Sequence, residues 1–265
     1  MIGFFQRGLL SVYAIANASG LLESGFGKWI FHRSYFAYKR WLEPTPLALK
    51  SYVKPGTWVV DVGANIGFYT LLLSRWVSAN GRVVSIEPEA GNFTELQNTI
   101  ATKGIDAKVV AFQAVASDID GYLRLRLNPE SHADHRIADE GVKTRSVRLD
   151  SFLQQWGNPR VSLIKIDVQG AELRVLLGSV RILSEFAPAV YMEVDDRALL
   201  ESNSSAAELI GWMQDRGYVA YAVKGEHLSA ALSLEEIFII LRKLGYADFL
   251  FLPLSTSQAN AAAAN

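Results

Sequence analysis

The sequence of 265 residues contains no cysteine, which excludes a group of chemistries at the outset. A chain without thiols forms no disulfide, has no cysteine nucleophile and binds no metal through thiolates. Neither a Walker phosphate-binding motif nor the Gly-x-Gly-x-x-Gly dinucleotide motif occurs in it. The charge balance is also unlike that of a nucleic-acid-binding protein, because 26 basic and 27 acidic residues leave a formal net charge of −1.

The composition is that of a folded chain. Half of the residues are hydrophobic and 20% are charged, so a large buried core is expected and disorder is not. The length suits one α/β domain with terminal additions, or at most two domains. We expect a helical, basic N-terminal segment at 1–50, a main domain at 51–254 and a disordered, low-complexity tail at 255–265.

The charge is distributed unevenly along the chain. Residues 1–54 hold seven Lys or Arg and two Glu, a net charge of +5, so the remainder carries −6. Such a segment suits either a solvated helical cap or contact with an anionic membrane surface. The apolar run 1–22 is interrupted by polar residues, which favours a packed or membrane-surface helix over a signal peptide or anchor. We expect a cytoplasmic protein, with peripheral membrane contact through residues 1–45 as the open alternative.

Strand-like and helix-like patterns alternate over most of the sequence, which predicts a doubly wound, mostly parallel α/β sheet. The regular alternation is broken by period-two residues 122–127 and 145–149, which predict an inserted hairpin around a polar loop at 128–141. Seven core strands are expected, at 57–62, 82–87, 107–114, 161–167, 189–194, 218–223 and 247–252. The helices between them are expected at 68–77, 91–104, 171–183, 206–216 and 233–243.

Candidate ligand-binding residues follow the first two strands, because ligands of such sheets bind beyond the carboxyl ends of the strands. The first strand leads into Asp61-x-Gly63-x-Asn65-x-Gly67, where glycine allows a sharp turn and close approach of a ligand. The second ends at Glu87, 24 positions beyond Gly63, near the spacing at which an acidic residue accepts ribose hydroxyls. A tight turn without ligand and a surface glutamate are the alternatives.

Five sequence blocks, in this order, resemble the FkbM-type family of class I S-adenosylmethionine-dependent methyltransferases. The resemblance covers roughly residues 55–195 and leaves out 1–50 and 225–265. Its blocks are residues 60–70, Glu87-Pro88 with Asn92-Phe93, Ala114-Val115-Ala116 with Asp120-Gly121, residues 149–153, and residues 164–172.

The resemblance implies a Rossmann-like class I methyltransferase fold and O-methylation of a sugar, glycolipid, polysaccharide or secondary metabolite, with S-adenosylmethionine as the cofactor. Nucleic acid is not an expected partner, and the oligomeric state is open. The cofactor-binding residues that it implies are Asp61, Gly63, Asn65, Gly67, Glu87, Pro88, Ala114 and Val115.

Asp167 and His135 are the candidate catalytic residues. Asp167 ends the fourth core strand, where a carboxylate could take the acceptor proton or orient the acceptor; the alternative is a helix cap. Lys165 shares its strand face, and a lysine in an apolar strand requires a carboxylate partner. His135 lies in the polar loop with His132 and Asp134, as a base, a metal pair or simply exposed histidines.

No metal is assigned, although oxygen ligands at the strand ends would suit Mg²⁺. Glu193, Asp195 and Asp196 end the fifth core strand, and an acidic rim for polar acceptors is the favoured interpretation. Glu172 is expected to favour the N-terminus of a helix. The competing functions are an NAD(P)-dependent Rossmann oxidoreductase, a catalytically silent cofactor-binding module, and a membrane-surface adaptor acting through residues 1–45.

Overall fold

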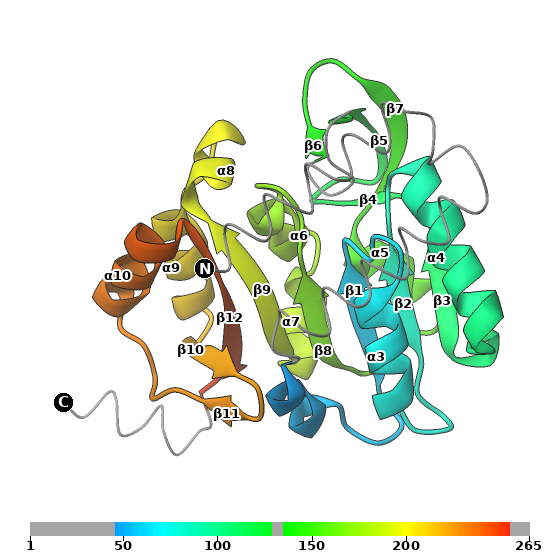
Figure 1. The fold of residues 1–265 in the computed structure, drawn as a ribbon, viewed down its shortest axis with the longest axis horizontal. Helices are drawn as coiled ribbons and strands as arrows, with labels where there is room; N and C mark the ends of the chain where they lie inside the picture. Colours follow the sequence, from blue (N-terminus) through cyan, green and yellow to red (C-terminus); the bar gives the residue numbers. More distant parts are fainter. Residues whose placement is uncertain (1–45, 129–134, 255–265) are drawn as a thin grey trace, which may run out of the picture.

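A computed structural model describes residues 46–128 and 135–254, which are built around an eight-stranded sheet (Figure 1). Its order is β11-β10-β12-β9-β8-β1-β2-β3, with five parallel strands from β9 to β3. All seven predicted core strands are present, and β11 is an additional edge strand. The strands are β1 (Trp58–Val62), β2 (Val83–Ile86), β3 (Val109–Phe112), β8 (Val161–Ile166), β9 (Ala189–Asp195), β10 (Tyr218–Lys224), β11 (His227–Leu228) and β12 (Tyr246–Pro253).

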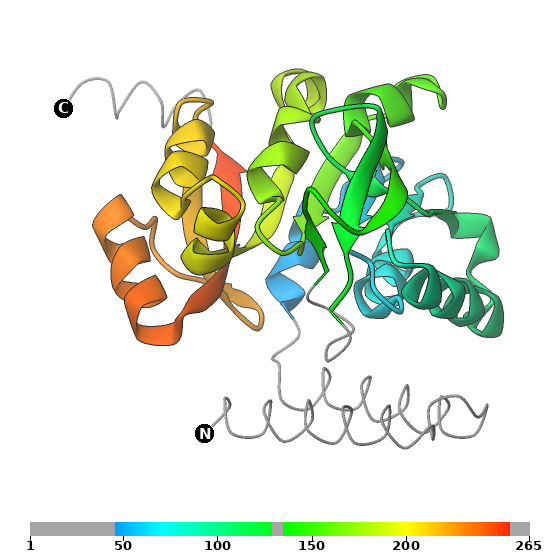
Figure 2. The ribbon, with the colours of Figure 1, turned by 90° about the horizontal axis from the view of Figure 1, so that it is seen from above.

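Helices cover both faces of this sheet (Figures 1 and 2). The 3₁₀ helix η2 (Leu47–Tyr52) and α3 (Phe68–Trp76) pack on the face to which Val59 and Leu163 point. The other face, which includes Val60 and Ile164, is covered by five helices. Burial on both faces explains why the parallel strands are almost continuously apolar in sequence. The five helices are α5 (Leu149–Gln154), α6 (Glu172–Leu177), α7 (Val180–Phe186), α9 (Ala206–Gln214) and α10 (Leu234–Leu244).

The inserted sheet has four strands in the order β4-β7-β5-β6. It contains the predicted hairpin, β5 (Gly121–Arg126) and β7 (Val142–Val147), which pair antiparallel. The short strands β4 (Val115–Ala116) and β6 (Arg136–Ile137) flank them. Figure 1 shows this sheet at the carboxyl ends of β1 and β2. An ion pair from Arg136 to Glu201 joins it to α8 (Asp196–Glu201), on the far side of these strand ends.

Two local predictions were wrong. The helix expected at 171–183 is two helices, α6 and α7, separated at Gly178 and Ser179. Residues 107 and 108 belong to the 3₁₀ helix η3 (Asp106–Lys108) instead of β3. Glu193 and Asp195 end β9 as predicted, while Asp196 is the first residue of α8. The Asp195 carboxylate also accepts from the amides of Arg197 and Ala198 as the N-cap of α8, and the acidic rim for polar acceptors stays a prediction.

Several predictions lie outside the described residues, namely those on residues 1–45, on His132 and Asp134, and on 255–265. The boundaries at 51 and 254 therefore stay predictions. Helix α4 (Ala90–Lys103) is the longest helix of the described chain. Within residues 46–128 and 135–254, no helix combines the length and apolar character needed to cross a bilayer.

Gly178, which lies between α6 and α7, allows a test of how tightly this junction is packed. Its backbone lies so close to the carbonyl of Ser117 that a Cβ would overlap that oxygen. We expect Gly178→Ala to reduce the free energy of unfolding by about 1–3 kcal/mol in urea denaturation, because the contact cannot relax through a flexible side chain. Gly211→Ala in α9 is the control, since nothing lies within 4 Å of its Cβ position and a helical alanine stabilises by about 0.5–1 kcal/mol. An equal effect of the two changes would contradict this explanation.

Candidate functional site

A row of buried polar side chains crosses the middle of the sheet on its α3 face. Strand register places Asp61 of β1 between Ser85 of β2 and Lys165 of β8, with Tyr191 of β9 beyond Lys165. All four are at most 5% exposed. Such a row is costly unless its members are paired, and each pairing here also positions an element of the strand-end edge.

Lys165 is the centre of this row. Its Nζ lies 3.2 Å from Asp61 Oδ1 and 3.4 Å from Asp167 Oδ2, and it donates to the carbonyl of Gly63 at 2.9 Å. The ammonium also lies 4.9 Å from the centre of the Tyr69 ring. The predicted pairing of Lys165 with Asp167 is confirmed, and it includes Asp61 as well. One buried cation therefore joins the turn after β1 to the end of β8.

Asp61 is fully buried, and its second oxygen accepts from the Thr70 hydroxyl at 2.7 Å. Thr70 lies in the first turns of α3 and also contacts the Ser85 hydroxyl at 2.9 Å. Asp61 therefore links β1 to the helix that follows the turn. A direct contact between Asp61 and a cofactor stays a prediction. In this structure Asp61 supports the turn through its contacts with Thr70 and Lys165.

The turn at residues 63–67 has an unusual backbone. Gly63, Asn65 and Gly67 have φ values of 71°, 50° and 95°, a region in which residues with a Cβ are disfavoured. A Cβ at Gly63 would also overlap the carbonyl of Asp167. Glycine at this position is therefore required both by the left-handed backbone and by the close packing of the two strand ends.

Every backbone amide of this turn already donates to an acceptor within the protein. The amides of residues 63 and 64 donate to Ile86 O, and that of residue 67 donates to Ala64 O. Asn65 N donates to Glu87 Oε2 at 2.8 Å, and Ile66 N to the Asn65 side chain at 2.8 Å. A dinucleotide diphosphate is held by amide donors at this place in a Rossmann fold. The turn lacks such donors, and this argues against the oxidoreductase alternative.

Glu87 closes the second side of the turn. Its Oε1 accepts from the amide of Glu89 at 3.0 Å, while Oε2 accepts from Asn65, and the residue is 4% exposed. Burial raises the pKa of Glu87 to about 7. The Asn92 side-chain amide adds a third, longer hydrogen bond to Oε1 at 3.5 Å. A carboxylate has about four lone-pair positions, so these three bonds leave acceptor capacity for one hydroxyl group. The residue thus fits the predicted ribose-binding role, which stays a prediction.

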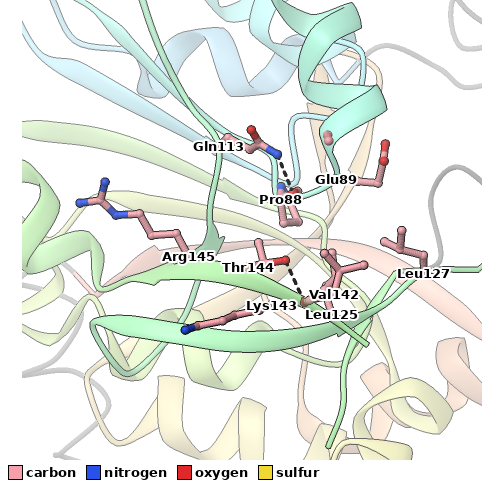
Figure 3. A pocket seen from close by; sticks show the side chains of 10 residues that line it. Pro88, Glu89, Gln113, Leu125, Leu127, Val142, Lys143, Thr144 and Arg145 are labelled. Carbon is pink, nitrogen blue, oxygen red and sulfur yellow. Dashed lines mark hydrogen bonds between the residues drawn. The ribbon is translucent and has the colours of Figure 1, made fainter. Parts of the chain in front are cut away.

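Pro88 lines a pocket of about 390 Å³ between the turn after β2 and the inserted sheet (Figure 3). Gln113 lies at its back and donates to the Pro88 carbonyl at 3.5 Å, while Leu125, Val142 and Thr144 form the opposite wall. Ala114 is fully buried and Val115 belongs to β4. The predicted contacts of Ala114 and Val115 with adenine would therefore have to come from their backbone.

The two candidate catalytic residues have different surroundings. Asp167 follows β8 directly, and 36% of its side chain is exposed, so an acceptor hydroxyl can approach it. His135 precedes β6, and its Nδ1 accepts from the amide of Asn128 at 3.2 Å. In the neutral ring the proton then lies on Nε2, whereas a base must present an unprotonated nitrogen. Both roles stay predictions, and Asp167 has the better geometry for a base.

Sequence reasoning did not anticipate the burial of Glu172. The side chain is 2% exposed; Oε1 accepts from the amide of Gly170 at 3.3 Å, and Oε2 has no hydrogen-bond partner among the described residues. Burial, opposed by these amides and reinforced by the nearby Asp167 and Asp195, raises the pKa of Glu172 to about 8. Glu172 stands in the first turn of α6, as predicted, but its burial depends on tertiary packing and could not be predicted from the helix position.

Asp195, which ends β9, and Asp196, which begins α8, have structural partners. Asp195 caps α8, and Asp196 accepts from the amide of Ala206 at 2.7 Å, which anchors the start of α9. Within the part of the chain that the structure describes, no three His, Asp or Glu side chains are arranged as a metal site. Asp195 and Asp196 therefore each have a structural role at the start of a helix, Asp195 at α8 and Asp196 at α9.

The protonated state of Glu172 predicts a pH dependence of stability. In the unfolded chain this carboxyl ionises near pH 4.5, whereas in the folded protein it holds its proton to about pH 8. The unfolded state binds fewer protons over this range, so stability falls as the pH rises, by at most about 1.4 kcal/mol per pH unit. Glu87 contributes in the same direction up to about pH 7.

Glu172→Gln removes this contribution while keeping the size of the side chain. We expect the free energy of unfolding, measured by urea denaturation between pH 5 and 8, to decline less steeply in this variant than in the unmodified protein. Glu185→Gln, at an exposed position on α7, is the matched control. Identical slopes in all three proteins would show that Glu172 is ionised in the folded state.

Comparisons with known proteins agree with this geometry. Residues 61–220, more than half of the chain, match the family described as Methyltransferase FkbM domain. Methyltransferase 1 of Beauveria bassiana is 29% identical over 193 residues, covering 63% of this chain and 71% of the fungal protein. The hexuronic acid methyltransferase AglP of Haloferax volcanii is 27% identical over 126 residues, covering 46% of this chain and 50% of the archaeal protein.

A solved structure supports the fold. The crystal structure of methyltransferase FkbM from Methylobacillus flagellatus aligns with a TM-score of 0.51 and 16% identity, over 75% of this chain and 44% of that protein. This chain thus spans half or less of the length of the archaeal relative and of the solved structure. The matched segment begins at Asp61 and contains the turn, Glu87, Lys165 and Asp167. The chain is a member of the FkbM methyltransferase family, with the Rossmann-like fold of class I methyltransferases.

Proposed function

We propose that this enzyme transfers a methyl group from S-adenosylmethionine to a hydroxyl of a sugar or of a sugar-containing acceptor. The observation that carries the proposal is the hydrogen bonding of the turn at residues 63–67, whose amides are all used within the protein. This turn suits a ligand without a diphosphate. Glu87, at the end of the next strand, already accepts from three donors and keeps acceptor capacity for one ribose hydroxyl of an adenosyl group.

Support for a sugar acceptor comes from the archaeal relative, which is named a hexuronic acid methyltransferase. That match spans only half of the archaeal protein, so the acceptor is proposed for this chain and not transferred from it. Secondary metabolites and glycolipids share the chemistry that the site requires, a hydroxyl able to reach Asp167. Association with a membrane through residues 1–45 and the extent of the catalytic domain, 51–254, belong to the same proposal.

S-adenosylmethionine supplies a methyl group already activated on a sulfonium, so alignment of the acceptor can provide much of the acceleration. Asp167 is proposed to accept the hydrogen of the acceptor hydroxyl and to hold its oxygen in line. Lys165 fixes the Asp167 carboxylate from one side, at 3.4 Å, and the Gly63 carbonyl from the other, at 2.9 Å. Both the acceptor-orienting group and the turn are therefore anchored to one buried cation.

The cofactor assignment predicts a specific binding pattern. Isothermal titration calorimetry is expected to give micromolar binding of S-adenosylmethionine and S-adenosylhomocysteine and none of NADH. Glu87→Gln is expected to weaken both adenosyl ligands at least tenfold, about 1.4 kcal/mol, because an amide donor replaces one acceptor oxygen. Glu95→Gln, in α4, where the side chain accepts from Asn98, is the matched control.

The same titration depends on pH. Since an ionised Glu87 accepts hydroxyls better than the protonated acid, and its pKa is about 7, affinity is expected to fall by up to tenfold per pH unit below pH 7. Glu87→Gln is expected to lose this dependence. Binding of NADH alone, or no adenosyl binding by folded protein, would contradict the proposed cofactor.

Substitution of Asp167 tests whether this site catalyses methyl transfer. Asp167→Asn is expected to reduce kcat about 10²- to 10⁴-fold on an accepted sugar hydroxyl, because the carboxylate that takes the proton is lost. The Kd for S-adenosylmethionine is expected to change little. Methyl transfer is measured with radiolabelled cofactor, and Asp139→Asn, at an exposed turn, is the control. Tight cofactor binding without transfer to any hydroxyl in a broad acceptor panel would favour the silent binding module instead.

A further inference from the structure

The inserted sheet carries a concentration of positive charge. Its four strands contain five basic side chains, those of Arg124, Arg126, Arg136, Lys143 and Arg145, and no acidic one. The whole chain, in contrast, has a net charge of −1. Arg136 is paired with Glu201 of α8, which leaves four cations to be explained.

Strand alternation places these four cations on one face. Register pairs Arg124 with Lys143 and Tyr122 with Arg145, while Arg126 follows two residues after Arg124. The four cations and Tyr122 are all exposed. Leu125 and Thr144, whose side chains point to the opposite face, are buried. We call Tyr122, Arg124, Arg126, Lys143 and Arg145 the basic face. Figure 3 shows Lys143 and Arg145 extending away from the wall formed by Leu125 and Val142.

The arrangement is unfavourable for the sheet itself. Like charges directly opposite on neighbouring strands are destabilising, as for Arg124 and Lys143 here, and Arg126 lies opposite Arg136 in the same way. Among the described residues, none of the four cations of the basic face forms an ion pair with a carboxylate. Instead Arg124 donates to the carbonyl of Gly141, Lys143 lies 4.4 Å from the Tyr122 ring, and Arg145 lies 4.9 Å from the Phe112 ring.

The sheet also lies beside the proposed site. Leu125, Val142 and Thr144 of this sheet line the pocket that Pro88 and Glu89 also line. Lys143 and Arg145 of the basic face belong to the lining of the same pocket. At the far edge of the sheet, the ion pair between Arg136 and Glu201 joins it to α8, which follows β9. The inserted sheet stands at the carboxyl ends of β1 and β2 (Figure 1), and the pocket shared by Lys143, Arg145 and Pro88 connects its basic face to the turn after β2.

We propose that the basic face binds the acceptor and that the acceptor is an acidic glycan with repeated carboxylates. This inference rests on the proposed function, from which it takes the sugar hydroxyl. Alternate residues of a strand are about 7 Å apart and paired residues about 5 Å apart, so the four cations form a ladder that a chain of anions can follow. Tyr122, 62% exposed, offers an aromatic surface for a sugar ring.

The composition of the basic face favours a glycan over a bilayer. Its side chains are cations and one tyrosine, while the aliphatic Leu123 and Leu125 of β5 point to the opposite face. A surface that binds membranes usually adds apolar side chains that insert between the lipids. Here an anionic partner with a polar, ring-containing backbone matches every exposed side chain of the face.

The experiment uses the full chain with bound S-adenosylhomocysteine and tri-galacturonate as the probe. We expect calorimetric binding that weakens more than tenfold between 50 and 500 mM NaCl, because salt screens exposed charges. Maltotriose, a neutral trisaccharide, is expected not to bind. The double variant Arg124→Gln and Lys143→Gln is expected to weaken tri-galacturonate at least tenfold, whereas Arg242→Gln with Lys243→Gln, at the exposed end of α10, leaves it unchanged.

Each other outcome overturns the inference. Equal weakening by the two double variants would mean nonspecific charge attraction, and equal binding of maltotriose would mean that charge is irrelevant. Binding only to vesicles of phosphatidylglycerol, or only to single-stranded DNA, would assign the basic face to a membrane or a nucleic acid. Absence of S-adenosylhomocysteine binding would instead contradict the proposed function, so the two failures are distinguishable in the same samples.

Discussion

The contact between the Lys165 ammonium and the Asp61 carboxylate, buried between β8 and β1, is the interaction on which the rest of this site depends. Removing one partner of a buried ion pair leaves an uncompensated charge, at a cost of about 3–5 kcal/mol. Here the same ammonium also holds the Gly63 carbonyl and Asp167. Stability of the sheet and geometry of the strand-end edge are therefore consequences of one pairing.

This arrangement explains why the site is built on strand ends. Asp61 and Lys165 are adjacent in register, so their side chains meet without any long connection. The turn after β1 then has little freedom, because its amides and its first carbonyl are bonded. Such a preorganised turn fixes a ligand at low conformational cost. Asp167 shares the cation with Asp61 while remaining open to solvent, which separates a positioning carboxylate from one that can meet an acceptor.

Two buried acids distinguish the neighbouring loops. Glu87 and Glu172 both have raised pKa values, yet Glu87 accepts from the amide of Asn65 in the turn after β1, while Glu172 is the first residue of α6 and accepts from the amide of Gly170. Both residues reduce the stability of the fold as the pH rises toward neutral, because the ionised carboxylate is disfavoured in the buried site and the unfolded chain releases the proton more easily. Proteins tolerate such strain mainly where it serves a site, and both lie at the carboxyl edge of the sheet.

Periodicity and turn chemistry were enough to predict the core strands along the chain, the hairpin of the inserted sheet and the helix that begins after Ser233. These features depend on neighbours in sequence, such as alternation along 122–127 or Ser233 with Glu236. The motif around Gly63 and the acid at Glu87 also stand in one short stretch, so the proposed cofactor residues could be identified without coordinates.

Long-range packing determined the remainder. The Ser117 carbonyl leaves no room for a side chain at Gly178, and Glu172 is buried although it stands in the first turn of a helix. Asp195 was predicted only as part of an acidic rim, and the structure shows that its carboxylate also caps α8. The basic face likewise exists only because register sets Arg124 opposite Lys143, nineteen positions away in the sequence. Contacts between residues far apart in the chain have no signature in local patterns, because local patterns reflect only the free energy of neighbouring residues.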